Sequence, residues 1–299
     1  MPYRIRSGHP LGEELARAAT EQIDRALAEI EDAGLDLEYT VHQVRKRCKK
    51  VRAILRLARD PLEDSDAYSK ENARFRDAAR RLSAARDATV MIKTYDALLA
   101  HFDDELDRPG FAPVRRALTV RKQDIHREAV RADEELGAFA EEMRQGREAV
   151  AGWAARIDGF ESLEGGLKKT YSRGRKAMRK AYEEPSGENF HEWRKRVKYH
   201  WYHCRLLNDL WPALLGARRK EADRLGDLLG DEHDLSVFRT RLAANEYAVG
   251  SDTTRDALVA LADRRRDQLR EAAAPLGGRL YAEKPKRFKK LMRCYWETA

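Results

Sequence analysis

The chain has 299 residues, of which 37% are charged and 42% are hydrophobic, and its formal net charge is +8. Its apolar residues recur at helical spacing, so this polar composition does not indicate disorder, and no stretch shows the alternation of a convincing strand. We therefore expect an all-α fold, built as one large domain or as two halves. The positive excess favours an anionic partner.

The first half of the chain reads as a series of helices after a polar lead. Residues 1–10 contain Gly8 and Pro10 and are expected to be poorly fixed. Helices are predicted at residues 11–31, 37–59, 66–81, 86–102 and 113–147. The second of these stops before Pro61, because the residue before a proline resists helical geometry. This predicted half spans residues 11–155.

The second predicted half spans residues 156–299 and begins around Asp158-Gly159. Helices are predicted at residues 165–182, 188–210, 213–229, 231–245 and 252–275, with a last helix after Pro285. A Pro-Ser-Gly break at residues 185–187 precedes the second of them, and Ser251 is a typical helix cap.

A basic segment of the first half recurs about 150 residues later in the chain. Laying His42 on His191 matches five pairs: Arg45 with Arg194, Lys46 with Lys195, Arg47 with Arg196, Lys49 with Lys198 and Arg56 with Arg205. A second match follows downstream, where residues 82–90 align with residues 229–237. Both matches keep nearly the same separation, which indicates a tandem duplication.

The repeated segment gathers its basic residues on one side of a helix. At about 100° per residue, His42, Arg45, Lys46, Lys49 and Arg56 fall within roughly a 100° arc, and the row is about 21 Å long. Apolar residues such as Val44 and Val51 lie opposite, as a helix packed on a core requires. No acid occurs between residues 41 and 59 to neutralise the row within its own helix. We therefore expect an anion to complete it.

These segments resemble the CHAD family, a helical domain named for its histidines, which binds inorganic polyphosphate. The matching pieces are the two His-x-x-Arg-Lys-x-x-Lys segments, the pairs Arg86-Asp87 and His233-Asp234, residues 171–175 and residues 280–288. The resemblance extends from about residue 12 to residue 296. It implies two helical bundles related by a pseudo-twofold axis, with their basic helices facing each other across a basic central groove.

The resemblance also implies a binding protein that is not an enzyme, with no cofactor and no metal. The cysteines, which lack disulfide or C-x-x-C spacing, and the lack of an apolar leader segment predict a cytoplasmic location, with association to polyphosphate granules as an option. The expected polyphosphate-binding residues are His42, Arg45, Lys46, Lys49 and Arg56 on the first basic helix and His191, Arg194, Lys195, Lys198 and Arg205 on the second, with Arg175, Lys176, Lys284 and Lys286 as secondary candidates. Arginine offers paired donors to phosphate oxygens, and lysine acts as a mobile point charge.

The two histidines are expected to be neutral in the free protein. Neighbouring cations lower the pKa of an imidazole, which leaves a neutral ring that can donate a hydrogen bond to phosphate. The plainer alternative is that His42 and His191 are structural hydrogen bonders.

An enzymatic function is one alternative, because His191, His233-Asp234 and Asp252 follow the order of an HD-type phosphohydrolase, which needs a metal. Arg86 lies opposite His233 in the repeat, and arginine cannot ligate a cation, so this reading is disfavoured. The Glu-x-Glu-x-Lys strand motif of the CYTH-type triphosphate hydrolases, frequent companions of CHAD domains, is absent. His200, His203 and Cys204 lack a fourth zinc ligand at the usual spacing and are predicted to be structural.

Non-specific nucleic-acid binding is the remaining alternative. It draws on the same charge and on Trp201 and Tyr202, although no nucleic-acid-binding signature supports it. The three cysteines have no C-x-x-C spacing and predict reduced, structural thiols. No apolar run is long enough to predict a membrane span.

Overall fold

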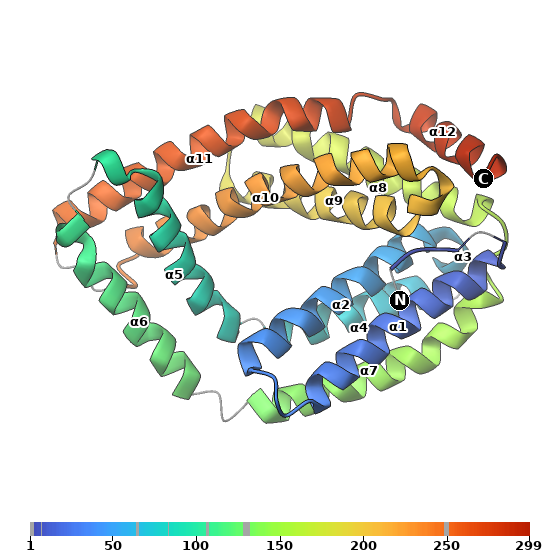
Figure 1. Ribbon diagram of the computed structural model, residues 1–299, viewed down its shortest axis with the longest axis horizontal. Helices are drawn as coiled ribbons and strands as arrows, with labels where there is room; N and C mark the ends of the chain where they lie inside the picture. The colour runs from blue at the N-terminus through green and yellow to red at the C-terminus, as the bar shows by residue number, and fades with distance from the viewer. Residues whose placement is uncertain are drawn as a thin grey trace.

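The computed structural model describes residues 3–6, 8–63, 66–82, 84–105, 108–127, 132–247 and 251–299, and its regular elements in these ranges are all helical (Figure 1). The all-α prediction is confirmed. The α-helices are α1 (Leu11–Glu31), α2 (Leu37–Leu57), α3 (Arg59–Glu63), α4 (Ala67–Arg81), α5 (Ala84–His101), α6 (Ala112–Arg127), α7 (Ala132–Ala154), α8 (Glu161–Glu183), α9 (Gly187–Leu206), α10 (Pro212–Ala243), α11 (Asp252–Leu280) and α12 (Pro285–Glu297). Short 3-10 helices in the described ranges join them: η1 (Asp103–Glu105), η2 (Arg108–Phe111) and η4 (Asn208–Leu210).

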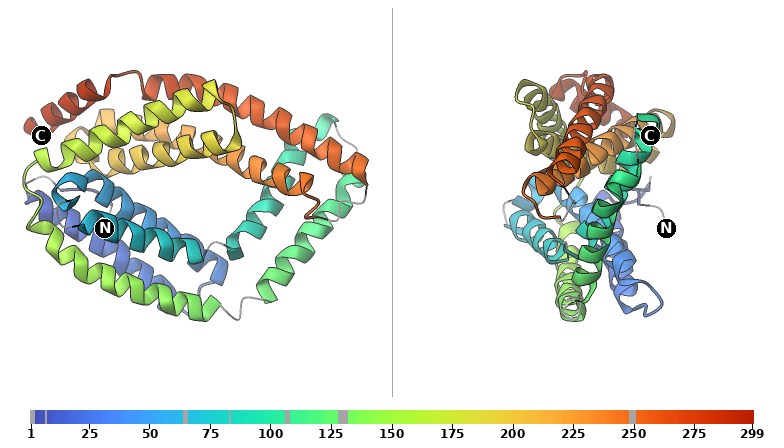
Figure 2. Two further views of the ribbon diagram at one scale, coloured as in Figure 1. Left: turned by 180° about the vertical axis from the view of Figure 1, so that it is seen from behind. Right: turned by 90° about the vertical axis from the view of Figure 1, so that its left-hand side faces the viewer.

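The long helices form two groups that converge at one end of the molecule and diverge at the other (Figure 1). One group holds α1, α2, α4 and α7, and the other holds α8 to α12. Helices α5 and α6 cross the open end, where α5 packs against α10 and α11 (Figure 2). The basic helices α2 and α9 are therefore inner helices of the two groups.

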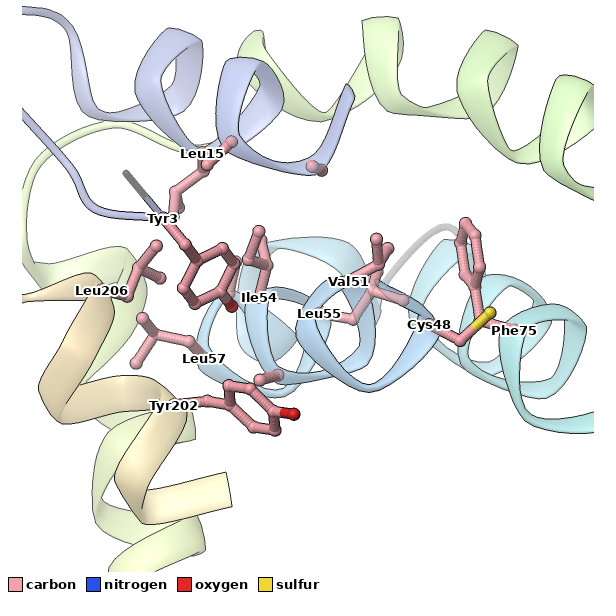
Figure 3. Packing of buried hydrophobic residues seen from close by; sticks show 14 of the residues in the cluster. Tyr3, Leu15, Cys48, Val51, Ile54, Leu55, Leu57, Phe75, Tyr202 and Leu206 are labelled. Atoms are coloured by element: carbon pink, nitrogen blue, oxygen red, sulfur yellow. The ribbon is translucent and has the colours of Figure 1, made fainter. Parts of the chain in front are cut away.

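One apolar core crosses the junction where the two groups converge, and the N-terminal segment is part of it. Tyr3 lies among Leu15, Ile54 and Leu206 (Figure 3), and it is only 2% exposed. The Ile5 N–H donates to the carbonyl of Leu206 over 2.9 Å. The sequence predicts a poorly fixed lead here, but the apolar side chains of this segment bind it to α1, α2 and α9.

A second, smaller core lies at the open end. Met91, Tyr95 and Leu98 of α5 pack there with Val114 of α6 and Phe238 of α10. Residues that the sequence assigns to the first half thus share a core with the distal ends of α10 and α11.

Several helices differ from the sequence prediction. The predicted helix 113–147 is two helices, α6 and α7, which run in different directions (Figure 1) and pack against different partners. Helix α10 continues through Gly230, where the sequence predicts a break. Helix α11 continues through Pro275, because Leu276 and Leu280 are buried in the large core and offset the hydrogen bond that proline cannot donate.

The two basic helices have equivalent neighbours. Helix α2 packs between α1 and α4, and α9 packs between α8 and α10. The tandem duplication itself stays a prediction from the sequence.

Candidate anion-binding surface

Local sequence sets where each basic helix begins and which side it exposes. The Asp36 carboxylate accepts the N–H groups of Glu38 and Tyr39 at the start of α2, and the Ser186 hydroxyl accepts the N–H of Asn189 at the start of α9. Val44 and Val197 are fully buried on the core sides of the two helices. The basic rows therefore lie away from the core, as the sequence predicts.

The C-terminal ends of α2 and α9 are in direct contact. The His203 Nε2 atom lies 2.9 Å from the carbonyl oxygen of Ala53, and the Arg56 guanidinium lies 4.3 Å from the centre of the Tyr199 ring. Lys49 of α2 contributes to lowering the pKa of His191 on α9, after burial and the nearer cations Lys195 and Arg194. Two parts of α2 thus face α9: Arg56 lies at Tyr199, and the charge of Lys49 reaches His191.

His191 stacks on His233 of α10, with ring centres 3.9 Å apart and an angle of 29° between the planes. Burial lowers the pKa of His191 to about 4, and burial together with the neighbouring His191 lowers the pKa of His233 to about 3. Both rings are therefore neutral near pH 7, in agreement with the prediction for His191. In the sequence, His233 belongs to a family motif and to the disfavoured phosphohydrolase order, and its contact with His191 beside the basic row was not predicted.

His42 has a different environment from His191. It is half-buried and lines a cavity of about 940 Å³ between the start of α2, α5 and α10. The walls of this cavity include Asp231 and Asp234 of α10 and Lys93 of α5. The two histidines that align in sequence thus have different neighbours: His42 lines a cavity, whereas His191 stacks on another histidine.

The remaining cations of the α2 row are spread along the helix. Arg45 donates to the carbonyl of Ala79 on α4 over 2.6 Å, Lys46 is half-buried and Lys49 is exposed. Arg56 donates to the Tyr68 hydroxyl over 3.4 Å in addition to its contact with Tyr199. From residue 41 to residue 57, α2 carries this charge without an acid, and the one acid of the helix, Glu38, lies before the row and pairs with Lys122 of α6.

The α9 row is partly neutralised by acids. Only the acid that pairs with Lys195 lies on α9 itself, so only this pair could be predicted from the helix sequence. Lys195 forms an ion pair with Glu192 on the same helix, whereas Lys198 lies 3.2 Å from Asp223 and 3.3 Å from Asp227 of α10. Arg205 packs against the Trp201 ring, 5.6 Å from its centre.

Two glycines of α10 allow this close packing. A Cβ atom at Gly226 would lie 2.8 Å from Cε of Lys198, and one at Gly230 would lie 3.2 Å from a guanidinium nitrogen of Arg194. The side chains of Lys198 and Arg194 can therefore lie directly across the α10 backbone. This explains why Gly230, which reads as a helix break, occurs within a continuous helix.

Sequence reasoning missed a basic cluster at the junction. Arg59, Lys169, Arg173 and Arg196 gather with Arg56 around the rings of Tyr68 and Tyr199. Burial, followed by the charges of Arg196 and Arg56, lowers the pKa of Arg173, so these cations are close enough to repel one another. The cluster draws its residues from α2, α3, α4, α8 and α9, and Figure 2 shows α4 and α8 on the same side of the molecule.

The rotation of α8 separates Arg173 from the secondary candidate Arg175. Gly174 packs against Tyr281, where a Cβ atom would lie 2.4 Å from the tyrosine oxygen. Arg173 therefore faces α2, whereas Arg175 donates to the carbonyl of Glu283 over 3.4 Å. The Lys169–Arg173 spacing of four residues was the available signal, since it places both on one side of the helix.

The other secondary candidates, Lys176, Lys284 and Lys286, also lie on different sides of α8. Lys176 is exposed and lies on the same side of α8 as Lys169 and Arg173. Lys284 and Lys286 are exposed at the start of α12, which packs on α8. The structure therefore brings Lys176 near the cluster and leaves Arg175, Lys284 and Lys286 beside a different part of α8.

The histidines of the zinc alternative are engaged in hydrogen bonds. His200 accepts from Arg218 over 3.0 Å, and its pKa is well below the usual range because it is buried. His203 contacts the Ala53 carbonyl. Within the described ranges, no three His, Cys, Asp or Glu residues are grouped as a metal would require. Over the same residues, no helix combines the length and apolar character needed to cross a membrane.

Comparison with known proteins identifies the family. A model described as the CHAD domain matches residues 17–243. The chain belongs to the CHAD domain family. Among solved structures, PptA from Streptomyces chartreusis has a TM-score of 0.59 at 16% identity, over 92% of this chain and 100% of that one. The CHAD domain from the plant Ricinus communis has a TM-score of 0.49 at 18% identity, over 100% and 97% of the two chains. No curated protein matches the sequence significantly. At this identity, the likeness to PptA shows the fold alone.

Proposed function

We propose that this CHAD domain protein binds inorganic polyphosphate along the basic rows of α2 and α9, without catalysing a reaction. The observation that carries the proposal is the convergence of cations from α2, α8 and α9 around the Arg56–Tyr199 contact. Arg59 and Arg196 of this cluster are paired with Glu63 and Glu192. The charges of Arg196 and Arg56 still act on Arg173, and a bound polyanion would remove that repulsion. Such binding would also attach the protein to polyphosphate granules.

Polyphosphate suits these rows because its phosphates are joined by single bridging oxygens and follow one another closely. A linear chain can therefore contact successive cations of a helical row about 21 Å long. Arginine offers paired donors to phosphate oxygens, and each lysine adds a point charge. Binding should release condensed counterions and depend steeply on salt concentration.

Calorimetric titration with long-chain polyphosphate tests this proposal. The test variant carries Arg45→Glu, Lys49→Glu, Arg194→Glu and Lys198→Glu. A matched variant carries Arg116→Glu, Arg121→Glu, Arg144→Glu and Arg147→Glu, which change the net charge equally at exposed positions of α6 and α7. Circular dichroism checks that both remain helical.

We expect tight binding by the wild type, near-complete loss in the test variant and a small loss in the matched variant. Equal losses in the two variants would mean that net charge alone drives binding. If the wild type does not bind polyphosphate, the same titration with single-stranded DNA tests the nucleic-acid alternative. Trp201 already packs against Arg205 and Lys198, so it is not an open platform for stacking bases.

A further inference from the structure

The stacked pair of His191 and His233 lies beside the basic row of α9 but carries no permanent charge. The two imidazoles face each other at 3.9 Å on adjacent helices. The Nδ1 atom of His191 and the Nε atom of Arg194 are both buried, and neither has a hydrogen-bond partner in the described part of the chain. An imidazolium has two N–H donors that need acceptors, so the free protein favours a neutral His191 ring.

The charged groups around the pair are mostly cations. From α9 come Arg194, Lys195 and Glu192, and the Glu192 carboxylate is already paired with Lys195 and Arg196. From α2 comes Lys49. Other charged residues lie on α10 and its neighbours. Four of them line the cavity of His42: Asp231 and Asp234 of α10, Lys93 of α5 and Arg265 of α11. Glu232 of α10 is paired with Arg266 and Arg270 of α11. The side chains of residues 84–87, at the start of α5, lie outside the described set.

We propose that the stacked His191–His233 pair takes up a proton when a phosphate chain binds beside it, so that the protein binds polyphosphate more tightly as the pH falls. This inference rests on the proposed function and adds a regulatory property to the same site.

The physical reason is the change of local charge on binding. In the free protein, burial and the cations Arg194 and Lys195 oppose a charge on either ring. A bound phosphate chain neutralises those cations and supplies acceptor oxygens, and both changes favour the protonated form. The pKa of the pair is then higher in the complex than in the free protein. By linkage, affinity rises as the pH falls below the pKa of the complex, until the free pair also becomes protonated.

The repeat gives this inference an internal control. Arg86 lies opposite His233 when residues 82–90 are aligned with residues 229–237. The first half thus has a permanent cation where the second has a titratable group. His233→Arg therefore gives the second half the residue that the first half has at the aligned position.

Calorimetry in two buffers that differ in ionisation enthalpy measures the protons taken up on binding. Long-chain polyphosphate is titrated into the wild type, His191→Gln/His233→Gln and His233→Arg at about pH 5.5, above the pKa values of about 4 and 3. Burial lowers the pKa of Lys50 to about 7. Lys50 is therefore charged at about pH 5.5 and does not take up a proton there. Affinities are then compared between about pH 5.5 and pH 8.

We expect the wild type to take up about one proton per bound protein and to bind about tenfold more tightly at the lower pH. The double variant should bind without this uptake. His233→Arg should bind tightly at both pH values with a weaker pH dependence. Tight wild-type binding without proton uptake, or unchanged uptake in the double variant, would overturn the inference and leave the proposed function intact. Absence of wild-type binding at either pH would overturn both.

Discussion

Lys49 and Lys198 match when the two basic segments are aligned in sequence, but the residues aligned beside them differ in charge. Lys198 lies between Asp223 and Asp227 of α10. When Leu82 is aligned with Leu229, the α4 residues opposite those acids are Arg76 and Arg80. The two acids beside Lys198 thus align with arginines on α4, of which Arg76 is paired with Asp77 over 2.7 Å.

This difference teaches that matched rows need not contribute equally to binding. A ligand that uses Lys198 must compete with two carboxylates, and this competition offsets part of the energy gained. The first half has no acid at the two α4 positions that align with Asp223 and Asp227. We therefore expect the first half to dominate the affinity for a polyanion. The following predictions test this inequality.

The largest effect should come from reversing charges in each half separately. We expect Arg45→Glu/Lys49→Glu to weaken polyphosphate binding about a hundredfold and Arg194→Glu/Lys198→Glu about tenfold, because Lys198 is already partly neutralised. Titration calorimetry of the two double variants in the same buffer gives the ratio. Equal losses would show that the acids of α10 do not weaken the second row.

Removing those acids should strengthen binding. We predict that Asp223→Asn/Asp227→Asn raises the affinity for polyphosphate about three- to tenfold, because Lys198 no longer has to leave a partner. The control is Asp252→Asn/Asp256→Asn at the start of α11, which removes the same charge elsewhere. A gain of the same size in the control would indicate a general effect of net charge.

Lys50 allows a stability test of the same asymmetry, since its counterpart in the repeat is the uncharged Tyr199. Burial, followed by Arg47 and Arg205, lowers the pKa of Lys50 to about 7. Between that value and the usual pKa of about 10.4, the unfolded chain binds more protons, so the cost of burying Lys50 is full below pH 7 and decreases as the pH rises. We expect Lys50→Met to raise Tm by a few degrees at about pH 6.5 and by less at about pH 9. Thermal unfolding at the two pH values measures the difference, and an equal change at both would contradict it.

The smallest effect concerns Gly226, whose counterpart in the first half is Ala79. Gly226→Ala places a methyl group against the flexible end of Lys198 and displaces it from the two acids. We expect about a twofold gain in polyphosphate affinity together with a small rise in Tm, because alanine favours a helix interior by about 1 kcal/mol over glycine. Loss of stability would show that Lys198 cannot move aside.

The sequence was informative where a signal lies within one helix. The bounds of α1 were predicted as observed, and the rows of α2 and α9 were predicted because they depend only on helical periodicity. Gly230 and Pro275 were read as breaks, but the contacts that keep α10 and α11 continuous come from distant helices.

Contacts between helices account for the parts of the candidate site that were missed. Asp223 and Asp227 reach Lys198 from another helix, and no spacing within α9 reveals them. Arg173 was within a recognised motif, but the packing of Gly174 on Tyr281 determines that it, and not Arg175, faces α2. Periodicity predicts which residues share a side of a helix, whereas tertiary packing determines what that side faces.

The most direct test of the central claim is the salt dependence of the Kd for long-chain polyphosphate, measured for the wild type and for the Arg45→Glu/Lys49→Glu/Arg194→Glu/Lys198→Glu variant. If the paired rows of α2 and α9 hold the chain, the logarithm of the association constant should fall steeply with the logarithm of salt concentration for the wild type. The variant should bind weakly with a much shallower slope. Equal slopes and equal affinities in the two proteins would contradict the account and place the polyphosphate elsewhere on the molecule.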